Sequence, residues 1–322
     1  MKTLRAAASV LNLSLRSSTS VFDAERPPQR SRRAHLTATL CRQLLDRSVD
    51  HTIAWVRERQ QLIALKCPEM RRCSFEWHKH GGVPCLYVEP KPAPTSDRAV
   101  IYYHGGGYAI GSVDGYRNTL SKLAVLTGAR VIGVEYRLAP ENRFPKGHDD
   151  AFRAAHSIIE EADGPVILAG DSAGAALCID VAQQLHKQHD DHMPHALALI
   201  SPWVKPIECL SDDTDAPQDV LSPALLKKWL LSYADESEAS DPRMEFIHTD
   251  LSFMPSTMVQ YAGSELFRPQ IEAFIRQAKQ SDCWIKVSCV EDQFHVFQTF
   301  WPMVPEAEPA LKELAQFIRD VN

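Results

Sequence analysis

Gly-Asp-Ser-Ala-Gly at residues 170–174 is the stretch that decides the fold, because of what flanks it. The apolar run 166–169 precedes it and the helix-like run 175–182 follows, so the sequence predicts a strand, a tight turn and a helix. Glycines on either side of a serine let the backbone turn sharply and lift the hydroxyl clear of the sheet. Ser172 would then stand at a helix N-terminus, where unpaired N–H groups and the helix dipole favour an oxyanion. An ordinary strand-to-helix turn is the alternative.

A second glycine-rich stretch also follows an apolar run. Residues 99–103 have the composition of a buried strand and lead directly into His-Gly-Gly-Gly-Tyr at 104–108. Successive glycines allow backbone conformations closed to other residues and let N–H groups approach a substrate oxygen. The pattern predicts an oxyanion hole that uses the N–H of Gly106, with that of Gly105 or Gly107, together with the N–H of Ala173. A flexible surface loop would be an unusual continuation of a buried strand.

Candidates for an acid and a base follow the last two predicted strands, 257–261 and 285–290. Glu265 comes after the first of these strands and His295 after the second. The chain order is therefore serine, acid, histidine, which is the order found in α/β-hydrolases. A loop histidine without a chemical role is the alternative for His295.

With these motifs, the sequence resembles the hormone-sensitive-lipase-like family of α/β-hydrolase carboxylesterases, the bacterial family IV esterases. The resemblance covers most of the chain and includes Glu-Tyr-Arg-Leu-Ala-Pro-Glu at 135–141, Leu-Ile-Ser-Pro-Trp at 199–203 and His-Val-Phe at 295–297. It implies a mostly parallel, eight-stranded sheet flanked by helices, with an N-terminal helical cap over the active site. It also implies a homodimer.

The expected acid departs from the family pattern. The family usually has Asp-x-Leu-x-Asp after the penultimate strand, whereas this chain has Glu-Leu-Phe-Arg-Pro at 265–269. The assignment of Glu265 therefore rests on loop position. The rivals are Asp292, only three residues before His295, and Asp282, which is expected at the opposite end of the sheet.

The length of 322 residues predicts one catalytic core with a cap. We expect the cap region over residues 1–70 and the core over 71–322, with an excursion outside the sheet at about 205–250 that contains a helix over 223–233. Leucines and alanines at helical spacing within residues 1–22 predict an amphipathic helix rather than a signal peptide. Two further cap helices are expected over 36–46 and 52–65.

Composition narrows the class of protein. The net charge of −6 offers no basic surface for nucleic acid, and no apolar stretch approaches the about 20 residues of a membrane span. The eight cysteines lack zinc-site spacing and are expected to be free thiols in a cytoplasmic protein. No metal or cofactor is required by the predicted chemistry.

Several other polar residues are expected to have structural roles. Arg137 is interpreted as a hydrogen-bonding residue, and Asp149 and Asp150 as caps of a helix that runs to about residue 161. Four histidines with irregular spacing are interpreted as a solvated helix end and loop rather than a metal site: His186, His189, His192 and His195.

The sequence thus predicts a serine esterase that hydrolyses short-chain esters through an acyl-enzyme on Ser172. Two alternatives stay open. One is a non-catalytic small-molecule receptor on the same fold, as in the gibberellin receptors, which lack the histidine that this chain has. The other is an amidase or lactonase, which side-chain identity alone does not separate from an esterase.

Overall fold

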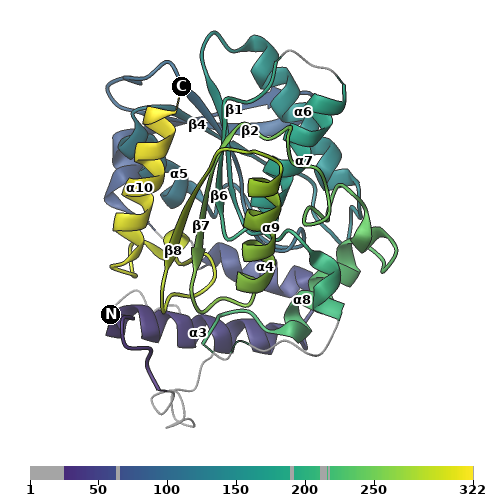
Figure 1. Cartoon of the computed structure of the whole chain (residues 1–322). Coiled ribbons are helices and arrows are strands. Elements are labelled where there is room, and N and C mark those ends of the chain that lie inside the picture. The colour runs from purple at the N-terminus through teal and green to yellow at the C-terminus, as the bar shows by residue number, and fades with distance from the viewer. Residues whose placement is uncertain (1–24, 63–65, 189–191, 211–215, 217, 322) are drawn as a thin grey trace.

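One eight-stranded sheet forms the centre of the computed structural model, which describes residues 25–62, 66–188, 192–210, 216 and 218–321 (Figure 1). The strand order is β1-β2-β4-β3-β5-β6-β7-β8. Strand β2 runs antiparallel to both of its neighbours, and the other pairs are parallel. The strands are β1 Cys73–His80, β2 Val83–Pro90, β3 Ala99–Tyr103, β4 Arg130–Val134, β5 Val166–Asp171, β6 Ala196–Ile200, β7 Ser256–Ala262 and β8 Ile285–Val290. This sheet confirms the predicted fold class.

Helices cover both faces of the sheet. Figure 1 shows α5 and α10 on one face and α6, α7 and α9 on the other. Every residue of β5 and β6 is buried, as expected for parallel strands covered on both sides. Side chains alternate between two apolar clusters, so Tyr102 packs with residues of α5 and α10 and Tyr103 packs with residues of α7. The helices are α5 Arg117–Thr127, α6 Lys146–Glu161, α7 Ala173–Lys187, α9 Arg268–Gln280 and α10 Ala307–Asp320.

Three helices lie together beyond one end of the sheet (Figure 1): α3 Arg32–Ser48, α4 Ile53–Leu62 and α8 Pro223–Tyr233. The cap helices expected over 36–46 and 52–65 correspond to α3 and α4, and the helix expected within the excursion is α8. Arg57 of α4 donates from Nε to the carbonyl of Ala109, in the loop after β3, at 2.8 Å. The helix expected within residues 1–22 lies outside the described residues, and the boundary at residue 70 stays a prediction. Short 3₁₀ helices are η1 Pro68–Arg72, η2 Pro206–Leu210, η3 Glu238–Ser240 and η4 Phe297–Phe300.

The helix-cap prediction for two aspartates is wrong. Helix α6 begins at Lys146 after Pro145, without a side-chain cap. Asp150 instead accepts hydrogen bonds from Nε and Nη2 of Arg137 at 2.6 and 2.7 Å, which confirms the structural role of Arg137. Asp149 lies in the first turn but pairs with Arg243 at 3.0 Å. Both residues lie inside the helix rather than at its N-cap, and each has a charge-assisted guanidinium partner.

Other features of the described residues bear on the class of protein. All eight cysteines are free thiols. None of the helices seen over these residues combines the length and apolar character needed to cross a membrane. The same residues include no cluster of three or more His, Cys, Asp or Glu side chains suited to a metal ion; His189 falls outside them.

Candidate active site

Ser172 occupies a sharp turn between β5 and α7. Its φ of 54° and ψ of −121° lie outside the regions that residues with a Cβ favour. A Cβ on Gly174 would collide with the carbonyl oxygen of Tyr103, so only glycine lets α7 begin this close to β3. The backbone of Ser172 is fixed on both sides, because its N–H donates to Ile200 O at 2.8 Å and its carbonyl accepts from Trp203 N at 3.2 Å. The turn that the sequence predicted is present.

The glycine loop after β3 lies against this turn. The N–H of Gly105 donates to Asp171 Oδ1 at 3.1 Å, so this N–H already has a partner. The N–H groups of Gly106, Gly107 and Ala173 make no hydrogen bond to any part of the chain that the structure describes. Of the two alternatives for the second donor from the loop, the geometry therefore favours Gly107 over Gly105.

Asp171 fastens the glycine loop to the turn, a role that sequence reasoning missed. Its buried carboxylate accepts hydrogen bonds from Tyr102 Oη at 2.8 Å and from Tyr116 Oη at 2.9 Å, besides the bond from Gly105. Burial raises the pKa of Asp171, while these three donors act against that shift. A Cβ on Gly105 would collide with Asp171 Oδ2, which explains the first glycine of the loop. The second residue of Gly-Asp-Ser-Ala-Gly, Asp171 itself, was the available signal.

The loops after β7 and β8 bring Glu265 beside His295. Glu265 Oε2 lies 3.5 Å from His295 Nδ1, and both side chains are almost fully buried. Ser201, in the loop after β6, donates from Oγ to the same Glu265 oxygen at 2.6 Å. His295 Nε2 makes no hydrogen bond within the described residues. The rings of His295 and Phe267 pack edge to face, with their centres 4.8 Å apart.

The two rival acids lie elsewhere. Asp292 Oδ2 accepts a hydrogen bond from the N–H of Gln29 at 2.7 Å, which turns it towards the N-terminal segment. Asp282 follows α9 and precedes β8, at the opposite end of that strand from His295. Among the three carboxylates considered, Glu265 is the one that contacts the imidazole.

The electrostatics of His295 reflect the carboxylates around it. Burial acts to lower its pKa, but Glu265, Asp219 and Asp171 outweigh burial, so the pKa of His295 is raised above 6.5. Burial, reinforced by Asp219, raises the pKa of Glu265, although His295 opposes that shift. The site is thus built to stabilise a positive charge on the imidazole.

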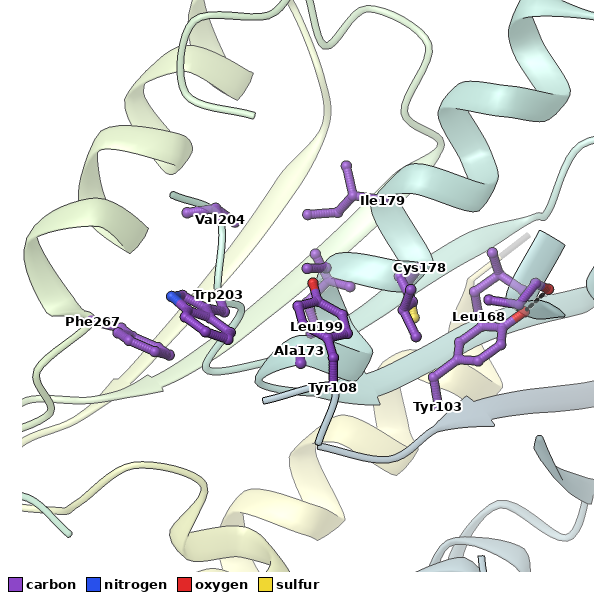
Figure 2. Packing of buried hydrophobic residues seen from close by; sticks show 14 of the residues in the cluster. Tyr103, Tyr108, Leu168, Ala173, Cys178, Ile179, Leu199, Trp203, Val204 and Phe267 are labelled. Atoms are coloured by element: carbon purple, nitrogen blue, oxygen red, sulfur yellow. Dashed lines mark hydrogen bonds between the residues drawn. The ribbon is translucent and has the colours of Figure 1, made fainter. Parts of the chain in front are cut away.

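An aromatic row extends from the glycine loop to His295. Figure 2 shows Tyr108, Trp203 and Phe267 side by side; adjacent ring centres are 5.8 and 5.7 Å apart, and the rings are stacked. Trp229 of α8 lies so close to Gly107 that a Cβ there would be 2.6 Å from its Cε3. Large rings therefore pack tightly around the loop.

Comparison with known proteins agrees with this geometry. An acetyl-hydrolase of Streptomyces hygroscopicus is 30% identical over 239 residues, which cover 73% of this chain and 80% of the relative. The family described as having the alpha/beta hydrolase fold matches residues 100–299, a range that holds both glycine motifs, Glu265 and His295. The chain belongs to this α/β-hydrolase family.

Within it, the chain is a hormone-sensitive-lipase-like carboxylic ester hydrolase. The crystal structure of an esterase from the bacterial hormone-sensitive lipase family has a TM-score of 0.79 at 26% identity. That alignment covers 88% of this chain and 97% of that one. An ethyl acetate hydrolase of Pseudomonas putida is 28% identical over 70% of this chain and 74% of its own length.

Proposed function

We propose that the chain hydrolyses short-chain carboxylic esters through an acyl-enzyme on Ser172, with His295 as general base and Glu265 as its acid partner. The observation that carries this proposal is the strained turn at Ser172, with an acid–imidazole pair on the neighbouring loops. Beside the turn are three N–H groups that have no hydrogen-bond partner among the described residues. Strain of this kind, of about 1–3 kcal/mol, persists where the surrounding structure fixes it and is concentrated at functional sites.

The proposed reaction has two halves. His295 Nε2 takes the Ser172 hydroxyl proton as Oγ attacks the ester carbonyl carbon, and the oxyanion is received by the N–H groups of Gly106, Gly107 and Ala173. Collapse breaks the ester C–O bond, and the alcohol leaves with the proton from His295. Water, deprotonated by the same imidazole, then attacks the acyl-enzyme and releases the carboxylic acid and Ser172.

The non-catalytic receptor alternative is disfavoured by the buried pair of Glu265 and His295. A binding pocket alone has no need for a buried imidazole beside a buried carboxylate, which is an expensive arrangement to desolvate. Amide and lactone hydrolysis use the same groups, so a substrate panel decides between those activities and ester hydrolysis.

The first prediction concerns acyl length. Trp229 and the Tyr108–Trp203 pair fill space around the glycine loop, so we expect a small acyl pocket. With p-nitrophenyl esters, kcat/KM should be highest between acetate and hexanoate and fall for longer chains. Ser172→Ala should abolish the activity. Equal or better turnover of long-chain, emulsified esters would contradict the acyl preference, and full activity of Ser172→Ala would contradict the mechanism.

The second prediction concerns the acid. Glu265→Gln keeps the shape but removes the charge that stabilises the imidazolium, so kcat should fall by about 100-fold or more while the unfolding midpoint stays close to that of the wild type. Asp292→Asn and Asp282→Asn serve as matched controls, because neither side chain contacts His295. Near-wild-type turnover of Glu265→Gln, with loss in either control, would show that the acid is misassigned.

The third prediction concerns pH. His295 must be neutral to accept the proton, and its pKa is raised, so activity should be lost as the pH falls through a value above the ordinary imidazole pKa of 6.5. The measurement is the pH profile of kcat/KM with p-nitrophenyl acetate between about pH 5 and 9. An acidic limb centred below 6.5 would contradict the proposed environment of His295.

The fourth prediction concerns assembly in the cytoplasm, where we expect the protein to act. Strand β8 forms one edge of the sheet and carries the exposed Val287, with the exposed Trp284 just before it. An apolar edge of this kind favours pairing with a second copy, so we propose a homodimer. Light scattering at micromolar concentration should give twice the mass of the chain, and a strict monomer would exclude the dimer.

A further inference from the structure

Asp219 lies in the excursion just before α8, yet its side chain is buried at 2% exposure. Its Oδ1 accepts hydrogen bonds from the N–H of His295 at 2.7 Å and from the N–H of Val220 at 2.8 Å. Its Oδ2 accepts one from the N–H of Leu266 at 2.9 Å. A single carboxylate therefore joins the residue after Glu265 to the backbone of His295.

The hydrogen bonds of Asp219 to these two loops set the spacing of the proposed acid and base. Glu265 and His295 come from the ends of different strands, β7 and β8, and their side chains meet at 3.5 Å. The two loop N–H groups that bind Asp219 belong to the buried His295 and the half-buried Leu266, and a buried donor left without a partner is destabilising. Removing the carboxylate thus frees both loops to move apart.

The cap region holds Asp219 in place from the other side. Nη1 of Arg42, on α3, donates to three carbonyls of the segment that contains Asp219: Ala216 at 3.3 Å, Asp219 at 3.2 Å and Leu221 at 2.7 Å. Nη1 of Arg30 donates to the carbonyl of Gln218 at 2.9 Å. Arg30 and Arg42 therefore fix the backbone of the segment that contains Asp219.

We propose that Asp219 is a positioning residue for the esterase reaction, because its carboxylate ties the loop of the acid to the loop of the base while arginines of the cap region hold its backbone. This inference rests on the proposed function. Asp219 acts through Glu265 and His295, and it is expected to affect the rate of the chemical step more than the binding of the ester.

The negative charge of Asp219 also affects the pKa of His295. The charged groups that act on His295 are Glu265 from the loop after β7, Asp219 from the excursion and Asp171 from β5. Arg30 lies beyond Asp219 and is itself influenced by Asp219, Asp292 and Glu306. Loss of the negative charge at 219 should lower the pKa of His295 and move the acidic limb of kcat/KM to lower pH.

The test is Asp219→Asn, measured with p-nitrophenyl acetate and normalised to the number of sites that react with a fluorophosphonate. Asparagine keeps one acceptor oxygen but points an NH₂ group at a second N–H donor, so one loop loses its anchor. We expect kcat per active site to fall about 10- to 100-fold with KM changed less than threefold, together with an acidic limb at lower pH.

Two further variants make the result specific. Asp219→Glu keeps both acceptor oxygens and the charge, so it should retain more of kcat than Asp219→Asn and restore the acidic limb. Asp292→Asn makes the same chemical change at a carboxylate that binds the backbone N–H of Gln29 instead, and kcat should stay within twofold of wild type. Counting active sites keeps the comparison valid if Asp219→Asn is less stable.

Unchanged kcat per active site in Asp219→Asn, with an unmoved acidic limb, would overturn the inference, as would an equal loss in Asp292→Asn. Failure of the proposed function looks different. In that case the wild-type protein itself would neither hydrolyse the ester nor react with the phosphonate.

Discussion

The turn at Ser172 is the constraint on which the site depends. The residue is held at φ 54° because β5 enters the turn fully buried and α7 leaves it against the carbonyl of Tyr103. Only glycine at 174 permits that approach, and hydrogen bonds from and to the backbone of Ser172 fix the strained conformation. The tightly packed apolar cluster around the turn, part of which Figure 2 shows, resists relaxation of the turn. The packing around the turn therefore maintains the strained backbone of Ser172.

Three buried carboxylates organise the loops that meet at this turn. Asp171 holds the glycine loop, and Glu265 lies beside Nδ1 of the His295 imidazole. Asp219 connects the loop of Glu265 with the loop of His295. Each carboxylate accepts hydrogen bonds from buried donors, which offsets the desolvation of its charge. The same three charges raise the pKa of His295. The same three carboxylates therefore position the loops and raise the proton affinity of His295.

Local patterns in the sequence were sufficient for most of the fold. An apolar run predicted β3 with the bounds that the structure has, since a buried parallel strand is typically a short, continuous apolar segment. The strand predicted over 285–290 also has the bounds of β8. The glycine motifs and the order of serine, acid and histidine placed Ser172, Glu265 and His295 at one end of the sheet. Their chemical roles remain proposals.

Tertiary contacts account for what the sequence did not reveal. Asp149 and Asp150 were expected to cap a helix, but α6 begins at Lys146 and guanidinium groups from outside that helix bind both carboxylates. Asp219 stands in an excursion rich in Asp, Ser and Pro, where nothing local distinguishes a buried acceptor from a solvated acid. Asp171 occupies a position that the Gly-x-Ser-x-Gly pattern leaves unspecified, so the motif itself does not predict a role for it. In each case the partner is distant in sequence, and periodicity carries no information about it.

The central claim is that Ser172 is a nucleophile. The most direct measurement is the intact mass of the wild-type protein after reaction with a fluorophosphonate, followed by peptide mapping, with Ser172→Ala treated in parallel. The account predicts one phosphonyl group per chain, located on Ser172 and absent from the alanine variant. A wild-type protein that stays unmodified, or one labelled at another residue, would contradict it.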